Sequence, residues 1–207
     1  LLLSLLLSKR FPGVTVIRFL VMLPMATMPA MMGMIFYYYF TKDGLVNYFL
    51  QFLIPGFAPN WVFDPQYVLL AAILLTIWEG TPFLMIIFLS WLQSLPSELY
   101  EQASIDGAGI FQKFRYITLP LLQPAIAYNI MVATISNLQA FDAPYVLGQG
   151  TGGPGFGTTT LAIDVYFTGF VDLRFGLCCA KAVIILILSW IVVLLLWRRV
   201  RGLYAIQ

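Results

Sequence analysis

Long apolar runs alternate with short polar segments along this chain. Four runs, at about residues 14–40, 67–93, 120–147 and 175–197, are each long enough for the roughly 20 residues with which a helix crosses a hydrocarbon core. The opening stretch, 1–8, is apolar but too short to cross, and we interpret it as the last turns of a helix that begins earlier. Because lipid offers no hydrogen-bond partners to an open backbone, this pattern predicts an all-α polytopic membrane protein.

Prolines and glycines mark breaks in the pattern. Pro24 and Pro29 interrupt the first complete run, and the connector 41–66 contains "NYFLQFL", which predicts a short helix at the membrane interface. The stretch "GQGTGGPGFGTTT", at 148–160, predicts a flexible loop. Residues 161–173 then predict an amphipathic helix at the surface.

Composition supports this class and excludes others. Hydrophobic residues make up 61% of the chain and charged residues 10%, against roughly 45–50% and 25% in a soluble domain. The net charge of +2 argues against a nucleic-acid partner. The chain has no histidine, and its two cysteines, Cys178 and Cys179, are adjacent, which favours small packing residues over a metal site or a disulfide.

The basic residues predict how the chain is oriented, because cytoplasmic loops are enriched in lysine and arginine. Strict alternation of the spans gathers most of them on one side: Lys9, Arg10, Lys113, Arg115, Arg198, Arg199 and Arg201. The other side holds two basic residues and four aspartates: Lys42, Arg174, Asp43, Asp64, Asp164 and Asp172. We therefore expect the polar segment at 94–119 to face the cytoplasm.

That polar segment predicts two short helices held off the membrane. Ser97 can cap the first helix, and Gly107 should end it or allow a sharp change of direction. A second short helix at about 110–116 leads into the next apolar run. Two helices joined at a glycine are suited to docking another protein, although a surface hairpin that only links two spans has the same local pattern.

The motif "EQA" at Glu101-Gln102-Ala103 is followed by Gly107 after three residues and by Ile117-Thr118-Leu119-Pro120 after nine more. This spacing resembles the EAA loop of permease subunits of binding-protein-dependent ABC importers, in the maltose-permease-like sugar branch. "FDAPYVLGQGTGGP" resembles the same branch, and the one departure within the motif is Gln102, where the family usually has alanine. The resemblance implies that these residues couple the chain to an ATPase: Glu101, Ala103, Asp106, Gly107, Ile117, Leu119 and Pro120.

The resemblance also implies a fold and partners. It predicts a type I ABC importer permease fold, with five spans here, the first truncated, of a six-span core. Residues 1–207 would form one transmembrane domain that is truncated at its N-terminus, and residues 94–120 its coupling loop. The implied partners are a second permease subunit that is a different chain, two copies of a cytoplasmic ABC ATPase, an extracytoplasmic solute-binding protein and membrane lipid. The implied location is the cytoplasmic membrane of a bacterium or archaeon.

No segment reads GxxxxGKS or GxxxxGKT, so we expect that this chain is not an enzyme and binds no cofactor. ATP and magnesium would be bound by the partner ATPases. We likewise expect no metal and no nucleic acid at this chain.

Glu79 lies at the centre of its apolar run, where an ionisable group costs about 2.5–3.5 kcal/mol, and is therefore a functional candidate. Thr76, Glu79, Gly80 and Phe83 share one helix face and offer a carboxylate, a hydroxyl, bare backbone and an aromatic ring to a sugar. Alternatively, Glu79 pairs with Arg18, Lys181 or the partner subunit and only stabilises the bundle.

A second polar face lies in the run 120–147. Asn129, Ser136 and Asn137 share this face, with Gln139 and Asp142 nearer the outer mouth, although hydrogen bonding between helices is an equal alternative for each amide. In maltose-permease-like relatives, the resemblance implies sugar contacts at the positions matching Thr76, Glu79, Gly80, Phe83, Met25, Pro29, Asn137 and Ala140. Met25, Pro29 and Ala140 are apolar here, so the identity of the sugar does not transfer.

Three other functions compete with import of a sugar, oligosaccharide or polyol. The first is an ABC permease for another solute such as glycerol phosphate, against which the scarcity of basic groups argues weakly. The second is an ATP-independent secondary transporter, for which the chain shows neither an internal repeat nor a relay of carboxylates around Glu79. The third is a membrane enzyme, for which it shows no nucleophile constellation.

Overall fold

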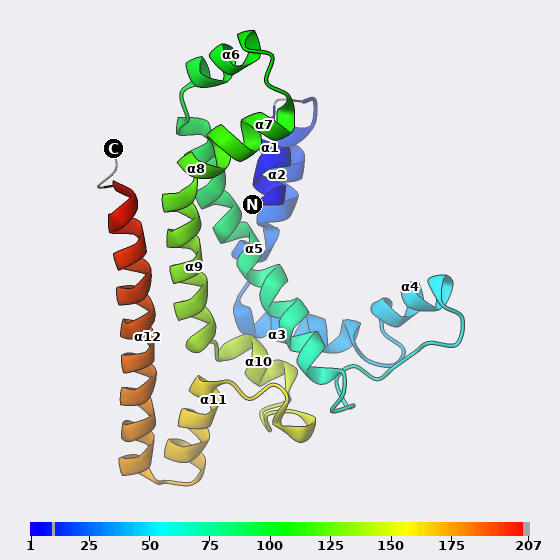
Figure 1. Ribbon diagram of the computed structural model, residues 1–207. Coiled ribbons are helices and arrows are strands. Elements are labelled where there is room, and N and C mark those ends of the chain that lie inside the picture. Colours follow the sequence, from blue (N-terminus) through cyan, green and yellow to red (C-terminus); the bar gives the residue numbers. More distant parts are fainter. Residues whose placement is uncertain (10, 205–207) are drawn as a thin grey trace.

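The computed structural model describes residues 1–9 and 11–204, with side chains described as far as Leu196. The described residues form helices and no strand (Figure 1). The helices are α1 (Leu2–Ser8), α2 (Val14–Met22), η1 (Leu23–Ala26), α3 (Pro29–Tyr39), α4 (Leu45–Leu53), α5 (Val68–Ser94), α6 (Ser97–Ile105), α7 (Ile110–Lys113), η2 (Phe114–Thr118), α8 (Leu119–Leu121), α9 (Gln123–Leu138), α10 (Asp142–Leu147), η3 (Pro154–Phe156), α11 (Leu161–Tyr166), η4 (Phe167–Val171) and α12 (Phe175–Tyr204).

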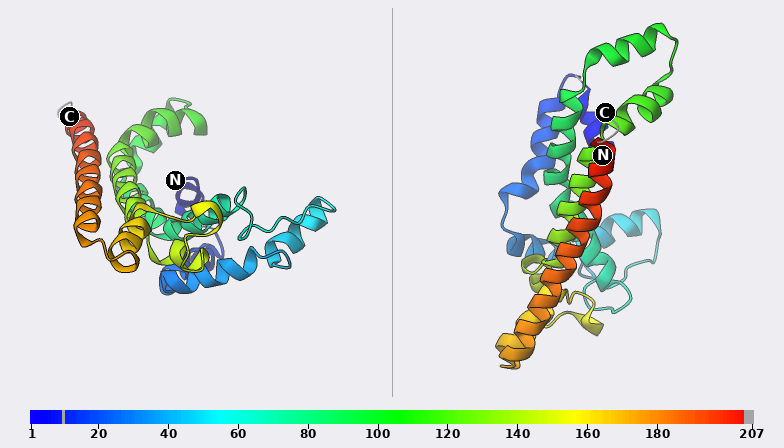
Figure 2. Two further views of the ribbon diagram at one scale, coloured as in Figure 1. Left: turned by 90° about the horizontal axis from the view of Figure 1, so that it is seen from below. Right: turned by 60° about the vertical axis from the view of Figure 1, so that its left-hand side comes forward.

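The long helices form an elongated bundle with α5 at its centre. Helices α1 and α2 pack against one side of α5, α9 packs against the other, and α12 runs alongside α9 (Figures 1 and 2). The short helices α6 and α7 form a hairpin beyond one end of the bundle. Helices α10 and α11 and the loop 148–160 lie at the opposite end. We call these the hairpin end and the loop end.

By length and composition, Val68–Ser94 and Phe175–Leu196 can each cross a membrane, as the sequence predicts. Two further spans are possible in the described part of the chain if each of two bent helix pairs counts as one. These pairs are Val14–Ala26 with Pro29–Tyr39, and Ile110–Leu121 with Gln123–Leu138. Leu2–Ser8 is a short helix packed on α5. The number of spans stays a prediction.

The first complete run is not one straight helix, because its two parts meet at 104°. Met28 adopts an extended conformation, with ψ at 136°, since the ring of Pro29 disfavours helical geometry in the residue before it. Pro24 lies in the 3₁₀ turn η1 just upstream. The two prolines predicted a break, but the sequence did not predict that α3 would lie crosswise beneath the bundle (Figure 1).

The prediction of one span over 120–147 is wrong in its second half. Helix α9 ends at Leu138. A separate helix, α10, begins at Asp142 and packs on α3. Pro144 has no N–H with which to bond the carbonyl of Ala140, so a helix could not continue through this point with its bonds intact. Oγ1 of Thr160 donates a hydrogen bond to that freed carbonyl instead.

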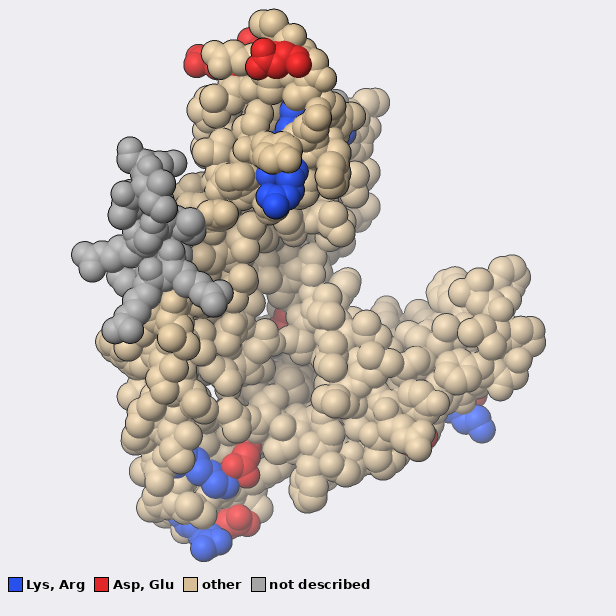
Figure 3. Space-filling model, viewed as in Figure 1, with Lys and Arg blue, Asp and Glu red and all other residues tan. Residues whose placement is uncertain are grey.

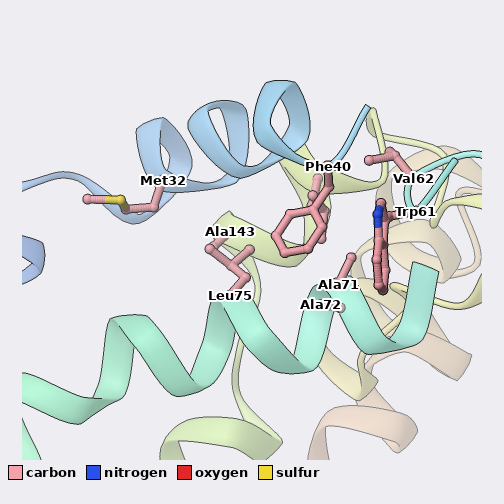
Figure 4. Close-up of a cluster of buried hydrophobic side chains, with 9 residues drawn as sticks. Met32, Phe40, Trp61, Val62, Ala71, Ala72, Leu75 and Ala143 are labelled. Carbon is pink, nitrogen blue, oxygen red and sulfur yellow. The ribbon is translucent and has the colours of Figure 1, made fainter. Parts of the chain in front are cut away.

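The largest buried cluster lies where α3, α5 and α10 meet (Figure 4). Small residues allow this close approach: a Cβ on Gly33 would lie 2.6 Å from the carbonyl oxygen of Ala143. Phe40 and Trp61 pack edge to face beside it, with ring centroids 5.7 Å apart. The cluster fixes the crosswise helix α3 against the loop end of α5.

The connector between α3 and α5 contains the predicted short helix, α4, as an arm projecting from the bundle (Figure 1). Asn47, only 1% exposed, holds the root of this arm. Its amide nitrogen donates to the carbonyls of Lys42 and Pro59, and its oxygen accepts from the indole of Trp61 at 2.8 Å. The predicted position of α4 at a membrane interface stays a prediction.

Charged side chains gather at the two ends of the bundle and beneath the projecting arm, and the surface between them is mostly uncharged (Figure 3). This distribution agrees with a protein whose middle lies in lipid. Arg10 and the side chains of Arg198, Arg199 and Arg201 lie outside the described residues, so part of the predicted charge bias is not visible. Which end faces the cytoplasm stays a prediction.

Candidate functional site: a central cavity and an exposed helical hairpin

A cavity of about 760 Å³ lies between α5, α9, α10 and the loop end. Most of the predicted pathway residues line it: Thr76, Glu79, Gly80, Phe83, Ser136, Asn137 and Gln139. Pro29 and Ala140 also line it, whereas Met25 is exposed elsewhere on the surface. Two faces that are separated by more than 40 residues in the sequence thus meet around one space.

Helix α5 lines this space on both sides of Pro82. Pro82 lacks the N–H that would bond the carbonyl of Trp78, so the helix is locally weakened within the cavity wall. No atom lies within 4 Å of the position that a Cβ on Gly80 would occupy. Thr76 donates its hydroxyl hydrogen to the carbonyl of Ala72 at 2.8 Å, which leaves its oxygen lone pairs facing the cavity.

Glu79 has no hydrogen bond or ion pair with any described residue. The two intrachain partners that the sequence suggested are engaged elsewhere. Arg18 donates to the carbonyl of Leu7, and Lys181 lies 2.7 Å from a carboxylate oxygen of Asp164. The intrachain alternative for Glu79 is therefore wrong, and a partner in another subunit stays open.

Asn129 is the one predicted pathway residue that does not line the cavity. It is 4% exposed, lies between α9 and α5, and donates to the carbonyl of Leu84 at 3.3 Å. This is the interhelical hydrogen bond that the sequence left as the alternative. Asn137 differs: it faces the cavity and donates to Ala133 of its own helix at 2.7 Å.

The loop end contributes to the cavity wall residues that the sequence analysis missed: Gly157, Thr158, Thr159 and Thr160. The predicted flexible loop is instead folded into hydrogen-bonded turns, including one from the amide of Thr158 to the carbonyl of Gly152 at 3.0 Å. A Cβ on Gly157 would lie 2.4 Å from Cγ1 of Val68, so the glycine permits close packing on α5. The run of three threonines after the glycines was the available signal.

The hairpin of α6 and α7 forms as predicted, except at its start. Helix α6 begins at Ser97, which is its first helical residue and makes no capping hydrogen bond, so the predicted Ser97 cap is wrong. Gly107 has a φ of +76° and ends the helix as predicted. The amide of Ala108 bonds the carbonyl of Ala103 at 2.8 Å, and that of Gly107 bonds Ser104 at 3.1 Å, which together make a Schellman motif.

The predicted coupling residues lie along this hairpin and its return. Glu101, Asp106, Gly107 and Pro120 are exposed, whereas Ala103, Ile117 and Leu119 are half-buried. Apolar side chains also project into the surroundings, with Ile105 86%, Ile110 83% and Phe111 77% exposed. Such a concentration of exposed apolar groups beside carboxylates is typical of a surface that binds another protein.

A helical membrane protein with a cavity that carries polar groups among its apolar helices, and with an exposed helical hairpin beyond them, has the architecture of a membrane permease. The chain belongs to the family of binding-protein-dependent transport system inner membrane components, whose sequence model matches residues 1–201. The resemblance that the EAA-like motif indicated is thereby confirmed.

Two curated relatives are similar over most of the chain. The trehalose/maltose transport system permease protein MalF of Thermococcus litoralis is 37% identical over 205 residues, which cover 96% of this chain and 67% of the relative. The sulfoquinovosyl glycerol transport system permease protein SmoG of Agrobacterium fabrum is 39% identical over 195 residues, which cover 89% of this chain and 59% of the relative. The chain thus spans about three fifths to two thirds of these relatives.

A solved structure supports the fold. The crystal structure of a bacterial alginate ABC transporter, in complex with an alginate pentasaccharide-bound periplasmic protein, contains a chain that matches with a TM-score of 0.82. The match covers 94% of this chain and 68% of that chain at 22% sequence identity. The predicted fold, that of a type I ABC importer permease, is confirmed.

Proposed function

We propose that this chain forms half of the translocation pathway of an ATP-driven ABC importer for a sugar, oligosaccharide or polyol. The observation that carries the proposal is the cavity, in which the side chains of Glu79, Gln139 and Ser136 have no hydrogen-bond partner among the described residues. Free polar groups beside the ring of Phe83 suit a solute with many hydroxyls and a C–H face. The names of the trehalose/maltose relative and of the alginate transporter support a carbohydrate.

The hairpin is the proposed point of coupling to two copies of a cytoplasmic ABC ATPase. Glu101 is exposed and able to contact a basic group there, while half-buried Ala103 keeps the surface flat. The left-handed turn at Gly107 lets the partner approach the backbone closely. Closure of the ATPases around ATP and magnesium, which they bind and this chain does not, would switch the cavity between inward and outward access.

The remaining partners follow from the same proposal. An extracytoplasmic solute-binding protein would dock at the loop end, which is supported by the periplasmic protein in the alginate transporter structure. A second permease subunit, a different chain, would supply the other half of the pathway. The assembly would lie in the cytoplasmic membrane of a bacterium or archaeon, with the hairpin on the cytoplasmic side.

Affinity purification of the full-length chain in mild detergent, followed by mass spectrometry, tests the proposal. We expect an ATPase and a second permease to co-purify, and both to be lost or weakened by Gly107→Asp. Gly109→Asp is the matched control, because Gly109 has a φ of −71° and its Cβ position has only the Gln112 side-chain oxygen nearby, at an ordinary contact distance of 3.8 Å. A chain that purifies alone and still moves solute into liposomes would overturn the proposal in favour of a secondary transporter.

A further inference from the structure

The cavity wall carries two carboxylates from different helices. Glu79 projects from the middle of α5, and Asp142 lies in the first turn of α10. Neither side chain makes a hydrogen bond or an ion pair with a described residue. Figure 3 shows an acidic group deep in the central hollow, surrounded by uncharged surface.

No basic residue lines the cavity among the described residues. The one lysine and the one arginine with described side chains along the bundle helices are engaged: Lys181 pairs with Asp164 and donates to Thr168, and Arg18 donates to the carbonyl of Leu7. The other described basic residues, Lys9, Lys42, Lys113, Arg115 and Arg174, are outside the cavity lining. On this chain, nothing described neutralises the two carboxylates.

Two further hydroxyl groups of the wall act only as hydrogen-bond acceptors. Thr76 and Thr81 both donate their hydroxyl hydrogens to carbonyls of their own helix, at Ala72 and Ile77. Their oxygens, like the carboxylates, can then only accept from a solute. Ser136, Asn137 and Gln139 can both donate and accept, so the feature that sets this wall apart is the negative potential of two carboxylates without a described cation.

We propose that this wall selects sugars that are uncharged or carry amino groups, and rejects sugars that carry carboxylate, sulfonate or phosphate. Hydroxyl and ammonium groups donate to the wall, whereas an anionic group would lie beside two like charges without a compensating cation. This inference rests on the proposed function, and it narrows the solute class by charge.

Equilibrium binding to the purified full-length complex in lipid nanodiscs, without the binding protein, tests the inference on the wild-type protein. The probes are neutral, amino and uronic di- and trisaccharides, with maltose, diglucosamine and digalacturonate as the matched set of disaccharides. We expect digalacturonate to bind at least about tenfold more weakly than the best neutral or amino probe. Equal or tighter binding of the uronic probes would overturn the charge selection and leave the carbohydrate function standing.

Charge removal at the two residues provides the second measurement. The double variant Glu79→Gln with Asp142→Asn preserves shape, and we expect it to bind digalacturonate at least about fivefold more tightly and diglucosamine correspondingly more weakly. Asp43→Asn with Asp172→Asn is the matched control, because both residues are exposed and outside the cavity lining. Unchanged charge preference in the cavity variant would overturn the inference. If no probe of any charge binds, the proposed carbohydrate function fails as well.

Discussion

The phenol oxygen of Tyr100 lies 2.9 Å from Oγ1 of Thr118, and this hydrogen bond joins α6 to the residue that precedes α8. Thr118 is only 6% exposed, so water competes weakly for the bond. It also ends the π-helical turn Phe114–Thr118, a geometry that is frequent at functional sites. The hairpin is thus fastened at its base to the helix that leads into α9, and a force on α6 has a direct path into the bundle.

Tyr100→Phe should uncouple transport from ATP hydrolysis in the assembled importer. The change removes one hydrogen bond, worth about 1 kcal/mol, so the fold should persist. We expect the number of solute molecules moved per ATP to fall while ATPase activity remains, measured together in proteoliposomes. Tyr116→Phe is the matched control, because Tyr116 is 74% exposed and has no hydrogen bond to a described residue. If both Tyr100→Phe and Thr118→Val leave the ratio of transported solute to hydrolysed ATP unchanged, this hydrogen bond has no role in coupling.

Gly107→Ala should loosen the end of α6. A Cβ at this position would contact no other atom, so the substitution causes no clash. It destabilises the turn by about 1–2 kcal/mol because alanine disfavours the left-handed backbone conformation. Hydrogen–deuterium exchange of the amides of Gly107 and Ala108, which close the Schellman motif, should rise about 5- to 30-fold. Gly109→Ala should leave those amides unchanged, since its φ of −71° suits any residue. Equal exchange in the two variants would show that the turn does not depend on glycine.

Gly33→Ala should separate α3 from α10. The added methyl group would lie 2.6 Å from the carbonyl oxygen of Ala143 and 2.9 Å from Cβ of Val146, and backbone cannot rotate away as a side chain can. Overpacking of this kind lowers the free energy of unfolding by about 1–3 kcal/mol. Each kcal/mol lowers the unfolding temperature of a chain of this size by roughly 2–4 °C. Thermal unfolding of the purified protein measures it. Gly176→Ala, with open space around its Cβ position, should leave the unfolding temperature unchanged, and a similar fall in both would contradict the packing argument.

The features that could be predicted from sequence are those that depend on local chemistry. Apolar length predicted α5 and α12, and the conformational freedom of glycine predicted the turn at Gly107. Helical spacing placed Thr76, Glu79 and Phe83 on one face, and all three line the cavity. These outcomes require no knowledge of how distant segments pack.

The features that the sequence could not give depend on contacts between distant segments. Prolines signalled a break before α3, but its crosswise direction is set by packing of Gly33 on Ala143, which no local pattern encodes. Asn129 and Asn137 look alike in sequence, yet only Asn137 lines the cavity. The rotation of α9 about its own axis, which is set by packing on α5, decides which of the two amides is buried. The threonines 158–160 belong to the site only because the loop folds back over it.

Asn129 and Glu79 should respond in opposite ways to substitution. Asn129→Leu removes an interhelical hydrogen bond, and such bonds contribute on average about 0.6 kcal/mol to the stability of a membrane protein. The substitution should lower the unfolding temperature slightly without changing solute affinity. Glu79→Gln removes an unpaired charge from the membrane region and should leave stability equal or higher, while solute affinity changes about fivefold or more. Thermal unfolding and equilibrium solute binding on both variants check the pair. If Glu79→Gln instead lowers stability and leaves binding intact, Glu79 is held by a partner subunit and has a structural role.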